Sequence, residues 1–325
     1  MFFMTIGDAA ALADTPMTVW QRAADPKGAT VERVHNAVEE YLARSSVKFP
    51  VRELALEDAR SLLEAAFARG IDSQGLHYDL AQVYFAQKRY SLVLRELTPI
   101  ASAPRDPSIS LAQVWDLLGM AYAHLEMHQE ERDAHREHLK VLRRDASRAV
   151  ATMNLAESEM ALGHLDESIA LYREAFRLAS ESQSMSGGDA AALSTWGLAV
   201  VLDRSGDPGA ALVEATRANT LDPSAQILTK DSVFFAPAYE RNWYLALSAE
   251  ATARSLPETS RERYLVTAAA YFRDYVNKAS EKGRTDRWIE LAKKRAERLE
   301  KQAEQAKKLR LRKQTPKGIE RLPVR

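Results

Sequence analysis

The sequence contains no cysteine, and this absence excludes several classes of protein at once. Disulfide-stabilised domains, iron–sulfur clusters, Cys-ligated zinc sites and cysteine nucleophiles all require that residue. Glycine (13) and proline (12) are scarce among the 325 residues, which argues against β-sandwiches, β-barrels and disordered chains and favours helices. No apolar run approaches the roughly 18 residues of a membrane-spanning helix, so we expect no such helix.

Sequence motifs of enzymes are also missing. The chain has no glycine-rich phosphate-binding loop, no G-x-S-x-G motif and no H-E-x-x-H motif. Paired carboxylates such as Glu130 and Glu131 stand at a predicted helix start, where solvation is their ordinary state. We therefore predict a protein that is not an enzyme, with no catalytic residue, cofactor or metal.

The net charge of zero conceals a segregation of charge along the chain. Residues 281–325 contain 16 Lys and Arg against 7 Asp and Glu, a net charge of +9, and the first 280 residues carry the opposite net charge of −9. Such a distribution bears on partners or self-association rather than on fold, although a solvated charged helix would produce it too.

Helical patterns recur in pairs along the chain. The clearest segment, Trp115–Tyr122, fits the pattern W-x2-L-G-x2-Y, with Gly119 in its small-residue column. The matching column holds Ala81, Ala156 and Ala199, so that the spacings are 38, 37 and 43 residues. Small residues in this column allow the two helices of a hairpin to cross closely.

Turn and stop signals accompany the last of these repeats. Gly206 permits a tight turn, Asp207 caps and Pro208 opens the following helix, and the pair Asp222-Pro223 ends it. Together with the column of small residues, these signals predict successive helical hairpins.

The four phased segments resemble the tetratricopeptide repeat family, most strongly over Leu155–Leu178 and Leu198–Pro223. The resemblance implies an all-α fold, a right-handed α-solenoid of helical hairpins whose concave face binds peptides or helices of partner proteins. Because the spacings exceed the 34 residues usual in this family, we place the additional residues in loops such as Ser102–Ser108 and Ser180–Asp189.

The pattern predicts five regions. They are a flexible N-terminus or remnant of an export signal (1–29), an N-terminal capping helical pair (30–72), four tetratricopeptide repeats (73–223), a linker with a degenerate fifth helical pair (224–280), and a long charged capping helix with a basic tail (281–325).

The family's geometry also predicts which side chains line the concave, partner-binding groove. They come from the first helix of each pair: Tyr78, Gln82 and Phe85; Asp116, Met120 and Ala123; Met153, Asn154, Glu157 and Met160; Trp196, Val200 and Asp203. Met and aromatic side chains in such a row are typical of a groove that holds a helix or an extended peptide. The same stripe is also compatible with a hydrophobic core or with a groove filled by the chain itself.

The groove row lacks the basic residues by which some tetratricopeptide domains clamp a C-terminal carboxylate, so that function is not predicted. A segment that would fill the groove is Val233–Pro237, which contains the adjacent Phe234 and Phe235. We interpret it either as a staple that holds the next helix to the preceding hairpin or as an exposed docking epitope.

Four of the seven histidines fall within fifteen residues: His124, His128, His135 and His138. Imidazoles at such spacings could bind zinc or copper if Glu131 or His128 completed the site. We favour the simpler interpretation that they are histidines of a helix interface.

From Trp288 to Ala306 apolar residues recur at alternating spacings of three and four, which predicts a helix of about 25 residues with a heptad seam. Alanine fills most of the seam and buries little area, so we expect Trp288, Ile289 and Leu291 to dock this helix on the last repeat as a cap. Its end carries a basic tail of Lys307, Lys308, Arg310, Arg312 and Lys313.

The basic tail supports two further expectations. It would attract an anionic surface, whether acidic lipid, nucleic acid or acidic protein. It would also favour weak, salt-sensitive self-association, with the tail of one copy near Asp116, Glu157 and Asp203 of another.

The first residues, Met1–Pro16, contain small residues spaced like a signal-peptidase site but no basic region before them. We expect a cytoplasmic protein, whereas a start upstream of Met1 would indicate a periplasmic one. The leading hypothesis is a non-enzymatic scaffold that binds a partner's peptide or helix in its groove. The alternative is an adaptor whose basic tail binds an anionic surface.

Overall fold

The computed structural model describes residues 2–4, 25–45, 51–104, 106, 109–143, 145–182, 185–230, 232–281 and 286–314. The chain forms two compact units, which we call the N-terminal unit (residues 5–158) and the C-terminal unit (residues 1–4 and 159–325). Both are built of successive helices, so the predicted all-α array of helical hairpins is confirmed. None of the described helices combines the length and apolarity needed to cross a bilayer.

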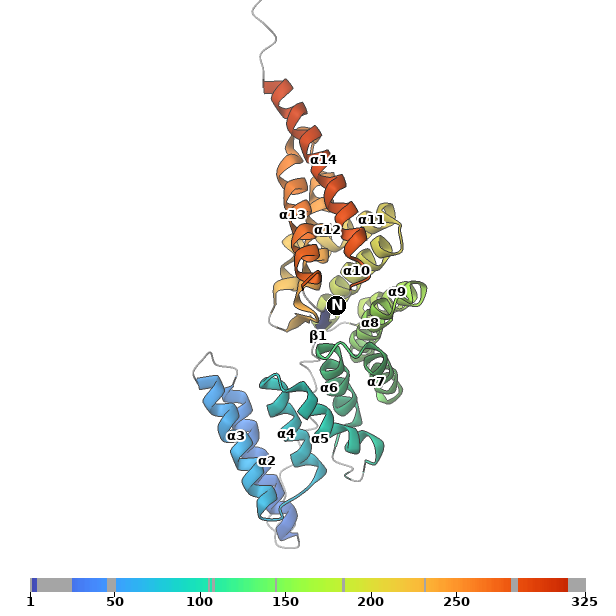
Figure 1. Ribbon diagram of the computed structural model, residues 1–325. Coiled ribbons are helices and arrows are strands. Elements are labelled where there is room, and N and C mark those ends of the chain that lie inside the picture. The colour runs from blue at the N-terminus through green and yellow to red at the C-terminus, as the bar shows by residue number, and fades with distance from the viewer. Residues whose placement is uncertain are drawn as a thin grey trace, which may run out of the picture. The chain divides into compact units, whose positions relative to one another are not determined.

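The N-terminal unit consists of consecutive antiparallel helices, of which the first two run side by side (Figure 1). They are α2 (Pro26–Arg44), α3 (Val51–Ala68), α4 (Gln74–Ala86), α5 (Tyr90–Ser102), α6 (Leu111–His124), α7 (His128–Val141) and most of α8 (Asp145–Leu162).

The C-terminal unit continues the pairing with longer helices and adds a small sheet. Its helices are α9 (Leu165–Glu181), α10 (Met185–Arg204), α11 (Pro208–Leu221), α12 (Arg241–Ser255), α13 (Glu262–Ala279) and α14 (Ile289–Gln314), with 3-10 segments η1 (Pro223–Thr229), η2 (Ala238–Glu240) and η3 (Glu258–Ser260). Strands β1 (Phe2–Met4) and β2 (Val233–Phe235) pair antiparallel.

Local signals set the helix ends where the sequence placed them. The side chain of Asp207 accepts a hydrogen bond from the amide of Ala210 at 2.9 Å, and Pro208 opens α11. Gly206 has a φ of +93°, a left-handed conformation that glycine adopts without strain. Helix α11 then ends at Leu221, directly before the Asp222-Pro223 stop.

The predicted small-residue column lies in the core. Ala81, Ala156 and Ala199 are fully buried, and Gly119 is buried on α6. A Cβ atom at Gly119 would lie 2.4 Å from the imidazole of His135 on α7. The close crossing of α6 and α7 therefore requires glycine at this position.

The prediction of a loop over Ser180–Asp189 was wrong. Helix α9 continues to Glu181 and α10 begins at Met185, so both helices extend into this segment. Gly187 explains part of the difference, since a Cβ there would lie 3.0 Å from the carbonyl oxygen of Ala179. Close packing of the two helices outweighs the weak helix propensity of the glycine and serines.

Strand β1 was not predicted, because residues 1–29 were expected to be flexible. It pairs Phe2 with Phe235 and Met4 with Val233. Residues 5–24, the greater part of that predicted region, lie outside the described residues.

The long C-terminal helix lies along α13 (Figure 1). Its predicted seam faces inward, since Ala292, Ala296, Leu299, Ala303 and Ala306 are all buried. The small alanines let α14 approach its neighbour closely over most of its length. Trp288, Ile289 and Leu291, which we expected to anchor the helix, are only half-buried.

Candidate partner-binding surface

The twelve predicted groove residues divide into two groups. Tyr78, Gln82 and Phe85, all on α4, are half-buried and retain exposed surface. The other nine, together with Ala123, are buried: Asp116, Met120, Met153, Asn154, Glu157, Met160, Trp196, Val200 and Asp203. The accessible part of the predicted stripe is therefore the face of α4.

Two of the buried residues hold the core of the C-terminal unit. The indole of Trp196 donates a hydrogen bond to Asp222 at 3.2 Å. Asp203 accepts a hydrogen bond from the indole of Trp243 at 2.9 Å and pairs with Arg295 at 3.2 Å. Removing either side chain would perturb the fold of this unit, so neither is a clean probe of partner binding.

An aromatic cluster continues the α4 face at the end of its helical hairpin. Phe85 contacts Tyr90, at the start of α5, edge to face, with a centroid separation of 5.4 Å. Tyr90 stacks on His124, at the end of α6, at 4.1 Å and 7°. All three residues are half-buried, so part of the cluster stays accessible to solvent. We call Phe85, Tyr90 and His124 the aromatic cluster.

The face of α4 and the aromatic cluster carry no charge near neutral pH. Burial, followed by the nearby Lys88, lowers the pKa of His124 to about 4, so its imidazole is neutral. Burial raises the pKa of Tyr90. Burial, followed by the charges of Asp116 and Asp79, raises the pKa of Tyr78 well above its usual range. These five residues, the three half-buried ones on α4 with Tyr90 and His124, therefore form an amphipathic surface with no ionised side chain of their own.

The four clustered histidines do not converge on one point. His124 belongs to the aromatic cluster, and His128 pairs with Glu131 at 2.9 Å. His135 lies beneath Gly119, while His138 lies 3.6 Å from Asp116. Burial lowers the pKa of His135 to about 3 and that of His138 to about 4, as expected for neutral imidazoles in a helix interface.

The Phe234–Phe235 segment belongs to strand β2. Phe235 is buried and contacts Tyr244 of α12 edge to face at 5.3 Å, and Arg241 lies over its ring at 5.2 Å. Phe234 is half-buried. The segment thus fastens the start of α12, which is the staple interpretation.

The five predicted basic residues lie in the last turns of α14, at the end of the long helix where the sequence placed them. Lys307, Lys308, Arg312 and Lys313 are exposed, whereas Arg310 pairs with Glu262 of α13 at 2.8 Å. The three acidic residues expected to receive the tail of another copy, Asp116, Glu157 and Asp203, are buried.

Sequence reasoning missed Tyr90 because the repeat pattern emphasises the first helix of each pair, and Tyr90 opens a second helix. An aromatic residue directly after the turn at Lys88, whose φ is +60°, was the available signal.

Neither a protein-family model nor a curated protein matches the sequence. Among solved structures, this chain is similar to one described as MamA AMB-1, with a TM-score of 0.44 and 16% identity, covering 59% of this chain and 93% of that chain. It is also similar to BtubC (BKLC) from P. vanneervenii, with a TM-score of 0.40 and 15% identity, covering 92% and 97% of the two chains. Both TM-scores are low, so the fold assignment rests on the helices of this chain itself.

Proposed function

We propose that this protein is a non-enzymatic scaffold that binds a peptide or helix of a partner protein. The accessible binding surface consists of Tyr78, Gln82 and Phe85 on α4, extended by Tyr90 and His124. The observation that carries the proposal is the half-buried, uncharged aromatic cluster next to the only predicted groove positions that retain exposed surface.

The physical character of this surface supports such a role. Aromatic side chains with exposed faces supply large contact area at low entropic cost, and they dominate the energy of protein interfaces. The spacing of residues 78, 82 and 85 places one side chain per helical turn along α4, which suits a partner helix or an extended peptide. The nine buried groove residues could contact a partner only if they became accessible. Their role in partner binding therefore stays a prediction.

A photo-crosslinking residue at position 82 of the full chain tests the proposal. The chain with the crosslinking residue in place of Gln82 should capture a discrete partner. The chain with that residue in place of the exposed Val213 should not. With the partner identified, Phe85→Ala combined with Tyr90→Ala should weaken binding by about 30-fold, the effect of losing one interface hot spot.

Val213→Ala combined with Val266→Ala is the matched control, because both side chains are more than half exposed on other helices. This control should bind like the wild type. A Phe85→Ala, Tyr90→Ala variant with an unchanged circular dichroism spectrum and unchanged affinity would contradict the proposal.

A second candidate function rests on the end of α14. Lys307, Lys308, Arg312 and Lys313 are exposed there together with Leu309 (36%) and Leu311 (48%). Basic residues interleaved with exposed leucines fit an anionic membrane surface. Binding of the full chain to vesicles with anionic lipid should then fall steeply with salt and vanish when the four basic residues are changed to Gln. Equal binding to neutral vesicles would exclude this function.

A further inference from the structure

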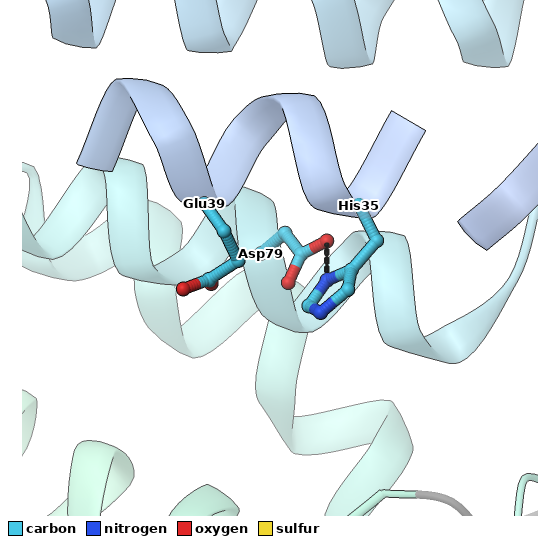
Figure 2. Close-up of side chains that lie close together, drawn as sticks. All are labelled: His35, Glu39 and Asp79. Atoms are coloured by element: carbon cyan, nitrogen blue, oxygen red, sulfur yellow. Dashed lines mark hydrogen bonds and ion pairs between the residues drawn. The ribbon is translucent and has the colours of Figure 1, made fainter. Parts of the chain in front are cut away.

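Three side chains with metal-ligating atoms meet between α2 and α4 in the N-terminal unit. His35 and Glu39 lie one turn apart on α2, and Asp79 lies on α4. Each offers an atom that lies within 4.8 Å of the other two. Figure 2 shows the Asp79 carboxylate against the His35 ring, with Glu39 descending from the same helix as His35 on the other side of Asp79.

The cluster has a buried base and an open rim. Asp79 is 1% exposed, whereas the side chain of His35 is 44% exposed and Glu39 is exposed. The Nδ1 atom of His35 lies 2.8 Å from Oδ2 of Asp79. An ion arriving from solvent would therefore meet His35 and Glu39 first and find the Asp79 carboxylate beneath them.

Among the described residues, the two carboxylates of this cluster have His35 but no lysine or arginine as an ion-pair partner. The other carboxylate oxygen of Asp79, Oδ1, is buried and has no hydrogen-bond donor. Burial, followed by the charge of Asp79, raises the pKa of Glu39. A buried carboxylate in this situation requires a cation or a proton.

We propose that His35, Glu39 and Asp79 bind a divalent transition-metal ion, with Zn²⁺ as the preferred ion. One imidazole and two carboxylates are a donor set suited to zinc, with a fourth position for water. An imidazole nitrogen discriminates against Ca²⁺ and Mg²⁺, which prefer oxygen ligands.

The separations within the cluster are close to those that zinc requires. Ligand bonds of about 2.0–2.2 Å in a tetrahedral site place neighbouring ligand atoms about 3.4 Å apart. The observed separations run from 2.8 Å to at most 4.8 Å. Rotation of the Glu39 side chain, which is long and exposed, can close the remaining gap without movement of the backbone.

Metal at this position would fasten two helices that are distant in sequence. His35 and Asp79 are 44 residues apart, and α2 packs against both α3 and α4. Because the cluster requires the folded arrangement of α2 on α4, bound metal would stabilise the N-terminal end of the unit by mass action.

A second group of ligating side chains, Glu159, His164 and Glu167, serves as an internal comparison. All three residues of this group lie within nine positions around one turn. Their proximity follows from local sequence alone, so we draw no metal site from it.

Titration of the metal-free full chain with Zn²⁺, Co²⁺ or Ca²⁺ by calorimetry tests the proposal. We expect calorimetry to show one Zn²⁺ bound per chain and little heat with Ca²⁺. With Co²⁺, absorption spectroscopy should show a visible band. His35→Ala and Asp79→Asn should remove this binding, and Glu39→Gln should weaken it by at least about tenfold. Saturating Zn²⁺ should raise the melting temperature of the wild type by roughly 5–10 °C and leave that of Asp79→Asn unchanged.

Two variants are matched controls. Glu40→Gln removes an exposed carboxylate next to Glu39, and His164→Ala removes the imidazole of the second group; both should bind Zn²⁺ like the wild type. Glu39→Gln changes only an exposed side chain, so loss of folding cannot account for its effect. The absence of Zn²⁺ binding, or binding that survives His35→Ala, Glu39→Gln and Asp79→Asn alike, would overturn the proposal.

Discussion

The two units of this chain differ in the partners of their buried acidic side chains. In the C-terminal unit, two buried acids meet buried arginines, since Arg204 pairs with Glu240 at 2.6 Å and Arg295 pairs with Glu250 at 2.5 Å, while the buried Glu159 pairs with His164. In the N-terminal unit, none of the buried residues that the structure describes is an arginine or a lysine. Three of its buried acids pair with histidines, as His35–Asp79, His128–Glu131 and His138–Asp116 show, while the buried Glu96 pairs with both His77 and the exposed Arg95.

The electrostatic consequences differ accordingly. Burial opposes ionisation of Glu240, but the guanidinium of Arg204 outweighs it and the pKa of Glu240 is lowered to about 2. In the N-terminal unit burial dominates, and it raises the pKa of Asp116 and that of Glu131 to about 7. The guanidinium of Arg204 keeps Glu240 ionised, whereas the histidines beside Asp116 and Glu131 do not offset the effect of burial on those two acids.

The difference shows that one helical-hairpin architecture can bury charge in two ways. The C-terminal unit contains the charged pair Arg204–Glu240, whose acid has a pKa lowered to about 2 and therefore stays ionised in the physiological range. The N-terminal unit contains groups whose protonation changes near pH 7, and its imidazole–carboxylate pairs are also the donors that a metal ion would use.

The largest expected effect comes from breaking a buried arginine pair. Arg204→Ala removes the partner of Glu240 and the cation above the ring of Trp243, 4.5 Å from its centroid. An uncompensated buried charge then remains, so we expect the C-terminal unit to lose about 3–5 kcal/mol of unfolding free energy. Urea denaturation followed by tryptophan fluorescence measures this loss.

Arg273→Ala is the control for that variant. Arg273 pairs with Glu300 at 2.9 Å, but both side chains are more than 40% exposed, so the loss should stay below about 1 kcal/mol. Equal losses from the two variants would mean that burial does not distinguish the pairs.

A pH-dependent effect should follow from Asp116→Asn in the N-terminal unit. Because the folded pKa of Asp116 is raised to about 7 from an ordinary 3.8, the ionised form is penalised in the fold. The penalty is fully present above pH 7, declines as the pH falls, and is absent below about pH 4, where the group is protonated in both states. The variant should be more stable than the wild type by roughly 1–3 kcal/mol at pH 8 and equal to it at pH 4.

Denaturation curves of Asp116→Asn and the wild type at both pH values test whether the variant is more stable at pH 8 and equally stable at pH 4. Asp133→Asn is the control, since Asp133 is an exposed acid on α7. A stability difference for Asp116→Asn that is constant with pH would contradict the prediction.

We expect Gly119→Ala to change the free energy of unfolding by a similar amount, but to destabilise the fold. The added methyl group would meet the ring of His135, and overpacking of this kind costs about 1–3 kcal/mol. Gly188→Ala is the matched change on α10, where no atom lies within 4 Å of the added methyl group. It should stabilise the chain by up to about 1 kcal/mol, because alanine favours the helix. Thermal unfolding of both variants shows whether each substitution lowers or raises the melting temperature.

The smallest effect is expected at the end of α14. Arg310→Ala removes the ion pair with Glu262, whose members are 40% and 24% exposed. We expect a loss below about 1 kcal/mol that disappears in high salt. Hydrogen exchange of the last turns of α14 measures it, and faster exchange that persists at high salt would argue for packing rather than charge.

Much of the fold could be read from local patterns. The small-residue column and the Gly206–Pro208 turn predicted the hairpins, and the heptad spacing predicted α14 as a helix of about 25 residues where the structure has 26. These features act within one or two turns of chain, so their signals are present in the sequence itself.

The candidate binding surface could be predicted only in part. Tyr78 and Trp196 occupy equivalent positions in the repeat pattern, but Tyr78 retains exposed surface and Trp196 is buried against Asp222. Periodicity assigns a side chain to a helix face, and it does not say what covers that face. Strand β1 was also missed, because it pairs with a segment more than 200 residues away and such pairing leaves no local pattern in the sequence.

The sequence by itself determined the helical hairpins, their turns and the long last helix, because propensity, capping and close helix crossing depend on neighbouring residues. Only the tertiary structure decided which of the predicted groove residues stay accessible and which buried acids receive an arginine or a histidine. It alone brought Asp79 to His35 and Glu39, since contacts between residues distant in sequence depend on how separate helices pack.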